Sequence, residues 1–150
     1  NLFDKKNKYA VFSQKAYAYK LNLLNESENN WHGSKMCLKK NLKSPQWLRN
    51  MKFKKYPFWR IDKPRKIQII DNGGWHFAYL LNPEDISQKI QSFAHGEYNS
   101  EDNVDINKIQ KKMSSMIHPT RGYKLKKVEI DHTFPKYIKD NIEKLKNWII

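Results

Sequence analysis

The stretch KIQIIDNGGWHFAYL, Lys66 to Leu80, places two short apolar segments on either side of a pair of glycines. Residues 66–70 and 76–80 each favour a strand, because both are short apolar runs beside turn-forming residues. Gly73 and Gly74 can adopt backbone conformations that other residues avoid. Two explanations of the pair stay open: a tight turn between the strands, or a backbone that closely approaches a bound phosphate or sugar.

The rest of the chain alternates between segments with a strand period and segments with a helix period. Ser44 and Asn82 each precede a proline, which is typical of a helix start. The expected strands cover residues 9–24, 31–38, 66–70, 76–80 and 123–130, and the expected helices cover 44–51, 82–94, 104–117 and 134–150. This interleaving predicts an α/β fold with a mixed sheet and flanking helices.

The 150 residues carry a formal net charge of +14, from 29 lysines and arginines against 15 acids. Only four of the basic residues are arginines, whose planar fork best recognises phosphate and guanine. The abundance of lysine, asparagine and isoleucine is also typical of an A+T-rich genome. The charge therefore does not single out nucleic acid, and attraction to anionic lipid or to a nucleotide-linked sugar explains it equally well.

Two absences narrow the class of protein. Cys37 is the only cysteine, which excludes an internal disulfide. No run of about 18 apolar residues occurs, so no segment of this sequence is expected to span a membrane. The compartment stays open, and a cytoplasmic or membrane-peripheral location is the expectation that we favour.

His76 lies beside the glycine pair in a segment crowded with aromatic rings. In a strand, Trp75 and Phe77 point to one face and His76 to the other, so the imidazole can enter a site whose scaffold the rings hold. An imidazole there can ligate a divalent cation or orient a phosphate. The alternative is a core histidine with ordinary hydrogen-bond partners.

The segment SFAHGEYN brings His95 and Glu97 after the helix expected at residues 82–94. If that helix continued, Glu97 would share its buried face with Ile86, where a carboxylate must be paired, protonated or used in chemistry. Gly96 favours an earlier helix end. Glu97 is therefore either a general base or a hydrogen-bond partner of a sugar, or an ordinary loop or capping residue.

Two further segments carry binding chemistry. The segment WHGSK combines Trp31 with Gly33 and Ser34, and its indole is either a stacking surface for a sugar ring or a hydrophobic plug behind a turn. Arg121 is isolated in a chain that otherwise uses lysine. This suggests a need for fork geometry, either in a phosphate clamp or in a structural salt bridge.

Several short segments, taken together and in their order along the chain, resemble those of a known family. KAYAYKLN is followed by WHGSKMC, Leu48-Arg49, NGGWHFAYL, ISQKIQSFAHGEYN, DINKI, the Arg121-Gly122 pair and FPKYIKDN. The ordered set resembles glycosyltransferase family seventeen, which includes the bisecting (β-1,4-mannosyl-glycoprotein) N-acetylglucosaminyltransferase. The likeness covers essentially the whole chain, and its most specific part is GGWHF-x-YL followed by KI-x-SFAH-x-E.

The resemblance implies a GT-A-like fold that transfers N-acetylglucosamine from UDP-N-acetylglucosamine to a glycan acceptor. Members of the family resemble metal-dependent enzymes, in which an acidic DVDE-like motif holds a divalent cation, Mn²⁺ or Mg²⁺. That motif does not occur in residues 1–150 and is expected upstream of Asn1. Residues 1–150 therefore resemble the C-terminal half of a single glycosyltransferase domain, and we expect this fragment alone to be inactive.

The resemblance also implies roles for individual residues. Glu97 is the expected base that deprotonates the acceptor hydroxyl, with His95 beside it, and His76 is an expected extra contact to the metal or the pyrophosphate. The expected donor and sugar contacts are Trp31, Gly33, Ser34, Gly73, Gly74, Trp75, Tyr79 and Arg121. The implied reaction is a direct displacement at the anomeric carbon. We therefore expect Trp31, His76, His95 and Glu97 around one concave surface.

Two other functions stay open. A basic, aromatic-rich module could bind polysaccharide or nucleic acid without catalysis, and a steep loss of affinity with salt would identify phosphate binding. A non-catalytic transferase remnant could still bind sugar. We expect no specific nucleic-acid partner, and we include peripheral contact with an anionic membrane among the candidate partners.

Overall fold

The structure is a computed structural model that describes residues 2–28, 30–52, 57–61, 63–92 and 100–150. It is a mixed α/β protein with two sheets and flanking helices, which confirms the expected fold class at this level. The chain divides into two compact units. Unit 1 comprises Asn1–Lys15 and Asn30–Trp75, and unit 2 comprises Ala16–Asn29 and His76–Ile150. Within the described ranges, no helix has both the length and the apolar character needed to cross a membrane.

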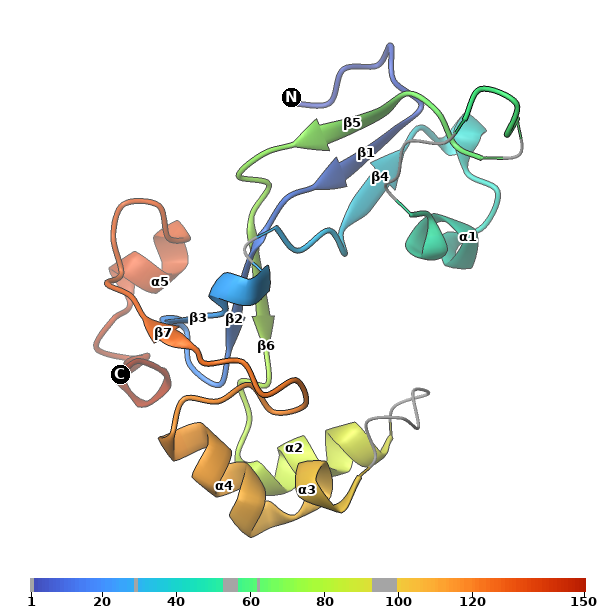
Figure 1. Ribbon diagram of the computed structural model, residues 1–150. Coiled ribbons are helices and arrows are strands. Elements are labelled where there is room, and N and C mark those ends of the chain that lie inside the picture. The colour runs from blue at the N-terminus through green and yellow to red at the C-terminus, as the bar shows by residue number, and fades with distance from the viewer. Residues whose placement is uncertain (1, 29, 53–56, 62, 93–99) are drawn as a thin grey trace. The chain divides into compact units, whose positions relative to one another are not determined.

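Unit 1 contains a three-stranded mixed sheet with the strand order β4-β1-β5 (Figure 1). The central strand β1 (Tyr9–Phe12) runs antiparallel to β4 (Lys35–Cys37) and parallel to β5 (Ile67–Ile70). Ala10 and Val11 of β1 are completely buried. The strands expected after Gly33 and at residues 66–70 are both present, and the core of unit 1 lies along β1.

The helical part of unit 1 begins where the sequence predicts it. The 3-10 helix η2 (Lys39–Asn41) and the helix α1 (Pro45–Asn50) follow β4. The Ser44 hydroxyl accepts a hydrogen bond from the Trp47 backbone N–H at 3.0 Å, which caps the first turn of α1. The Trp47 and Tyr9 rings lie 5.4 Å apart between centroids, so α1 packs against β1.

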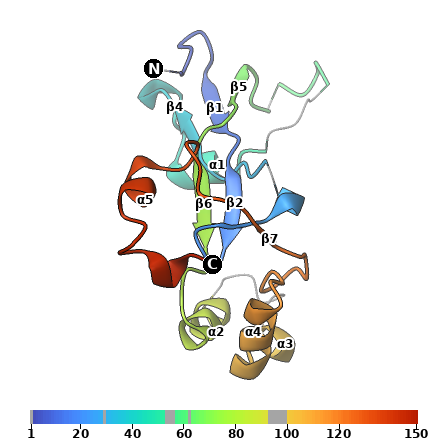
Figure 2. The ribbon, with the colours of Figure 1, turned by 90° about the vertical axis from the view of Figure 1, so that its left-hand side faces the viewer.

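Unit 2 contains the four-stranded sheet β6-β2-β3-β7. Its strands are β2 (Lys15–Ala18), β3 (Leu23–Leu24), β6 (Trp75–Ala78) and β7 (Lys126–Lys127), although Lys15 and Trp75 are counted with unit 1. Its helical elements are η1 (Glu26–Glu28), α2 (Pro83–Gln91), α3 (Glu101–Val104), α4 (Ile106–Ser114), α5 (Lys136–Asp140) and η4 (Lys146–Trp148). Figure 2 shows α2, α3 and α4 packed together within this unit.

The helix α2 supplies much of the unit 2 core. Its cap is as expected, because Asn82 Oδ1 accepts a hydrogen bond from a backbone N–H three residues later at 2.8 Å. Ile86 and Ile90 are completely buried, and Ile109 of α4 lies in the same core cluster. The helical period of residues 82–94 also predicts Phe93 on this buried face, and Phe93 lies outside the described residues.

The helix expected over residues 104–117 is interrupted near its start. Asp105 has an extended backbone that ends α3, and its carboxylate accepts a hydrogen bond from the Lys108 backbone N–H at 2.8 Å, which caps α4. The helix therefore begins anew at Ile106, while Ile109, Met113 and Met116 still pack in the core cluster. The helical period of residues 104–117 predicts that Ile106 and Ile109 both face the core. This is wrong for Ile106, which is 42% exposed, and right for Ile109, which is completely buried.

The expected strands are shorter than their apolar patterns suggested. Residues 9–24 form three strands instead of one, because β1 and β2 pair in different sheets and because Tyr19, whose φ is 65°, ends β2. All residues from Ala16 to Tyr19 are buried, so this segment lacks the polar face that alternation implied. The strand expected over residues 123–130 is reduced to β7.

The C-terminal segment is less helical than its periodicity suggested. The helix expected over residues 134–150 is present only as α5 and η4, with turns between them. The helical period of residues 134–150 predicts that Ile138 and Ile142 both face the core. Ile138 is buried, whereas Ile142 is exposed. Asn22 anchors the end of this segment, because its side chain exchanges two hydrogen bonds of 3.0 Å with the Ile150 backbone.

Candidate functional site

The glycine pair lies between strands of different sheets, since β5 pairs with β1 while β6 pairs with β2. The pair is therefore not the turn of a hairpin. A β-carbon at Gly73 would lie 2.7 Å from the β-carbon of Phe12, so no larger residue fits without a shift. Gly74 has a φ of +126°, a conformation that strains other residues. Both glycines are required by the local structure of unit 1.

Trp31 packs against the backbone of Gly33 in unit 1. The indole occupies the space that a β-carbon at Gly33 would need, which explains a glycine at this position. Trp31 also exchanges two backbone hydrogen bonds with Gln14, at 2.9 and 3.1 Å, and the Ser34 carbonyl accepts one from the Phe12 N–H at 3.0 Å. This geometry favours the explanation of Trp31 as a ring packed behind a turn.

His76 is the first residue of β6 that belongs to unit 2, and it is half-buried. Burial lowers the pKa of the His76 imidazole below its ordinary value of 6.5; the Glu28 carboxylate opposes this shift and the Lys89 ammonium adds to it. His76 is therefore mainly neutral at pH 7. A neutral imidazole can accept a hydrogen bond or ligate a cation.

A second histidine of unit 2, His118, is 7% exposed. Burial lowers the pKa of its imidazole to about 4; the Glu28 carboxylate opposes this, and two nearby cations lower it further. The Tyr79 ring meets the imidazole edge to face at 5.9 Å between centroids, and the Tyr123 ring lies at 6.3 Å. His118 is thus a neutral imidazole held between two tyrosines.

Hydrogen bonds from two directions fix the loop that carries His118. The Tyr19 hydroxyl donates to the Ile117 carbonyl at 3.0 Å, and burial raises the pKa of that hydroxyl. The His118 backbone N–H donates to the Tyr123 carbonyl at 2.7 Å. The backbone on both sides of the imidazole is therefore held in place.

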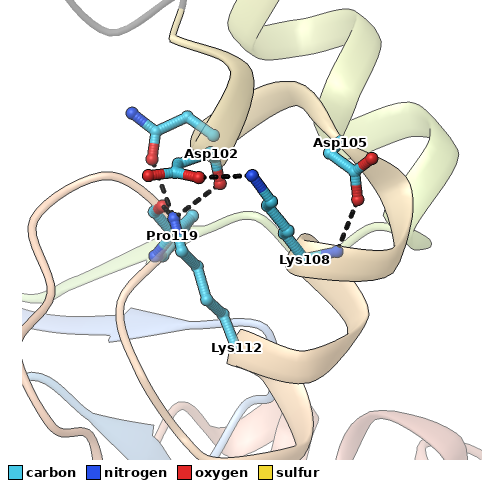
Figure 3. Close-up of polar contacts among 6 residues, drawn as sticks. Asp102, Asp105, Lys108, Lys112 and Pro119 are labelled. Atoms are coloured by element: carbon cyan, nitrogen blue, oxygen red, sulfur yellow. Dashed lines mark hydrogen bonds and ion pairs between the residues drawn. The ribbon is translucent and has the colours of Figure 1, made fainter.

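Lys112 of α4 ties the same loop to α3 (Figure 3). Its ammonium donates to the carbonyls of Asp102 and Pro119, both at 2.9 Å, and to the Asn103 side-chain oxygen at 2.8 Å. Burial lowers the pKa of Lys112. A lysine with three oxygen acceptors at normal distances is a positioning group, and it holds the residue next to His118.

Arg121 lies in the same loop and forms an ion pair with Glu28 of η1. The Glu28 carboxylate also accepts a hydrogen bond from the Asn25 side-chain amide at 3.2 Å. The structural salt bridge that the sequence left open for Arg121 is therefore present. A guanidinium carries five N–H donors, so one arginine can hold a carboxylate and a phosphate together.

Unit 2 brings together three of the expected site residues, His76, Tyr79 and Arg121. Glu28 pairs with Arg121 and lies close enough to His76 and His118 to affect the pKa of both. Tyr79 belongs to the same cluster, because its ring contacts the His118 imidazole. We call these five residues the Glu28 group. It combines one ion pair, two neutral imidazoles and one buried tyrosine.

The other expected site residues fall elsewhere. Unit 1 contains Trp31, Gly33, Ser34, Gly73, Gly74 and Trp75. His95 and Glu97 lie outside the described residues. The concave surface expected to be shared by Trp31, His76, His95 and Glu97 therefore stays a prediction.

His76 does not form a metal centre with its described neighbours. In the part of the chain that the structure describes, no three His, Cys, Asp or Glu side chains gather into a group that could hold a metal ion. Glu28 is the carboxylate near His76, and Arg121 engages it. The expected role of His76 as an extra ligand would need other ligands, and the divalent cation stays a prediction.

Sequence reasoning did not single out His118, Glu28 or Lys112. Glu28 lies in the polar run NESENN, which is typical of a turn, and Lys112 is one of several lysines on its helix. The three acceptors of Lys112 come together only in the folded chain. One signal was available: HPTRG places His118 three residues before the isolated Arg121.

Comparison with known proteins gives no match to a family model, to a curated protein or to a solved structure. The function is therefore inferred from the residues and from the geometry of the Glu28 group.

Proposed function

We propose that the protein is a glycosyltransferase that transfers N-acetylglucosamine from UDP-N-acetylglucosamine to a glycan acceptor. In this proposal, residues 1–150 are the C-terminal part of a GT-A-like domain of the family-seventeen type. The observation that carries it is the meeting of His76, Tyr79 and Arg121 in the Glu28 group. These residues come from two distant segments of the ordered set that resembles the family.

The chemistry of the Glu28 group suits a sugar nucleotide. Arg121 offers the fork geometry that binds phosphate oxygens, and neutral His76 can donate or accept a hydrogen bond with a sugar hydroxyl. Tyr123, which lies against His118, is 38% exposed and offers aromatic surface beside the group. Aromatic surface next to hydrogen-bonding groups suits a pyranose ring, which has an apolar C–H face and hydroxyl groups around its edge.

In the proposed reaction, an acceptor hydroxyl attacks the anomeric carbon of the donor and UDP departs. The new glycosidic C–O bond forms as the bond from the anomeric carbon to the β-phosphate oxygen breaks. Glu97 is the proposed base that takes the hydroxyl proton, with His95 beside it. Arg121 would offset the charge that develops on the departing diphosphate. A divalent cation is a proposed further partner, and no step is assigned to it.

A transfer assay tests this proposal directly. The product of the complete reading frame that contains this chain is incubated with UDP-N-acetylglucosamine and a panel of mannose-containing glycans. UDP-glucose and UDP-galactose serve as matched donors. We expect UDP release that requires both an acceptor and the N-acetylglucosamine donor, and an acceptor that gains one N-acetylhexosamine. If no donor binds and none releases UDP with any glycan, the proposal is wrong.

A further inference from the structure

The positive charge of the protein is concentrated in unit 1. This unit has 16 lysines and arginines against 3 acids, a net charge of +13, whereas unit 2 has 13 against 12, a net charge of +1. The Glu28 group lies in the nearly neutral unit. The proposed sugar site therefore does not explain why the positive charge is concentrated in unit 1.

One loop of unit 1 exposes large apolar side chains. Phe58 is 80% exposed, Trp59 66% and Ile61 88%, and we call these three residues the apolar tip. The Phe58 and Trp59 rings contact each other edge to face at 5.1 Å between centroids. Adjacent apolar side chains with this much exposure are typical of a surface that binds a protein, a membrane or a ligand.

The loop has a defined turn structure that holds the apolar tip outward. The Arg60 N–H donates to the Pro57 carbonyl at 3.0 Å, and the Ile61 N–H donates to the Trp59 carbonyl at 2.9 Å. The Arg65 guanidinium also donates to the Phe58 carbonyl. Backbone groups of the loop are thus bonded within it while its apolar side chains face solvent.

Basic residues surround the base of this loop. A hollow of about 300 Å³ is lined by Ile61 of the apolar tip, by four cations and by two aromatic rings. The cations are Lys8, Lys43, Lys63 and Arg65, and the rings are those of Tyr9 and Trp47. The Lys43 ammonium lies 5.2 Å from the Trp47 ring centroid. The loop therefore combines an apolar tip with a cationic base.

We propose that unit 1 docks on an anionic lipid bilayer through this loop. Phe58, Trp59 and Ile61 enter the interfacial region, where aromatic and aliphatic side chains are favoured. The cations around the hollow meet the phosphates of the lipid headgroups. Stable peripheral binding needs two signals, and this loop supplies both an apolar insertion and a basic patch.

The geometry favours a membrane over a nucleic acid. Single-stranded nucleic acid stacks successive bases on parallel ring faces, but the planes of Phe58 and Trp59 cross at 81°. Ile61, the most exposed of the three, has no stacking face. An apolar tip of this kind suits acyl chains. The proposal does not depend on transferase activity.

Vesicle sedimentation tests the docking. The protein is mixed with phosphatidylcholine vesicles, with or without about 30% phosphatidylserine, at low and high salt. We expect binding only to the anionic vesicles. The triple variant Phe58→Ser, Trp59→Ser, Ile61→Ser should bind at least about tenfold more weakly, and Tyr137→Ser, which removes an exposed ring of unit 2, should bind as the parent does.

Charge variants and quenching complete the test. Lys8→Glu with Lys43→Glu should weaken vesicle binding, while Lys144→Glu with Lys146→Glu in unit 2 should not. Brominated lipid should quench tryptophan fluorescence of the parent, and Trp59→Phe should keep binding but lose most of the quenching. The proposal is overturned if the triple variant binds like the parent, or if an oligonucleotide binds and anionic vesicles do not.

Discussion

The two units differ most clearly in their acidic residues. Their basic residues are similar in number, 16 in unit 1 and 13 in unit 2, but their acids number 3 and 12. A genomic preference for lysine codons acts on both units, so it does not account for this difference. The net charge of +14 therefore combines one strongly positive unit with one that is nearly balanced.

The polar interiors also differ. In unit 2 the buried Asn22 bonds to the Ile150 backbone and, at 3.2 Å, to the Val128 carbonyl. In unit 1, Gln14 Oε1 is buried without a hydrogen-bond partner, which is the one such side-chain atom among the described residues. Fully bonded interior groups fix a single geometry. Among the described residues, unit 1 therefore has one buried polar side-chain atom without a partner and unit 2 has none.

The largest effect on stability is expected from truncating the unit 2 core. Ile109→Ala should lower the free energy of unfolding by about 2–5 kcal/mol, because the side chain is completely buried among Ile86 and Ile90. Ile106→Ala is the matched control on the same helix, and it should cost less than about 1 kcal/mol because Ile106 is exposed. Urea unfolding measures both. Equal losses would contradict the register of α4, in which Ile109 is buried and Ile106 is exposed.

A large effect on turnover is expected from the proposed base. In the complete reading frame, Glu97→Gln should lower turnover roughly a hundredfold or more and leave donor binding almost unchanged, because the base acts on the acceptor side. His76→Ala should instead weaken donor or metal binding, visible as a higher metal requirement. If Glu97→Gln stays folded and keeps full turnover, Glu97 is structural and another residue is the base.

A smaller, pH-dependent effect is expected from His118. The folded imidazole has a pKa of about 4 against an ordinary value of 6.5, so between these values the unfolded chain binds a proton that the folded chain does not. Stability is therefore highest above about pH 6.5 and should fall by about 2 kcal/mol between pH 7 and pH 5. Urea unfolding at both pH values measures the loss.

The variant His118→Gln isolates this contribution. It should remove most of the loss of stability between pH 7 and pH 5. The loss that remains should again be a destabilisation at the lower pH, because the pKa of His76 is also lowered. A parent protein whose stability does not change between pH 7 and pH 5 would show that His118 is accessible to solvent or paired with an acid.

The smallest effects are expected from the two glycines with positive φ. Gly74→Ala in unit 1 should destabilise the protein by about 1–2 kcal/mol, since a β-carbon there meets the Gln14 amide at 3.1 Å and φ is +126°. Gly122→Ala in unit 2 has a φ of +70° and open space around it, so only the backbone cost of about 1 kcal/mol applies. Thermal unfolding of the two variants ranks them, and a larger loss at Gly122 would reverse this order.

Local signals predicted the fold where they acted within a few residues. Ser44 and Asn82 cap α1 and α2 as expected, because an N-cap bonds a backbone N–H only three residues away. Periodicity over longer spans was less reliable. It did not anticipate the cap at Asp105 or the positive φ of Tyr19, which divide an expected helix and an expected strand.

The site was predictable only in part. The sequence singled out His76 through its glycine and aromatic neighbours and Arg121 through its isolation among lysines. The crowding that requires a glycine at Gly73 became visible only in the folded chain. It could not show that Glu28 would lie beside Arg121, because 93 positions separate them and only tertiary packing joins them. The same holds for His118, whose low pKa arises from burial that no local pattern reveals.

Hydrogen exchange of the complete reading-frame product with and without UDP-N-acetylglucosamine tests the central claim, that the donor binds at the Glu28 group. We expect slower amide exchange in residues 76–79 and 117–124 when the donor is present. Residues 57–61 and 63–66 of unit 1 serve as the internal control and should not change. Protection confined to unit 1, or no protection at saturating donor, would contradict the account.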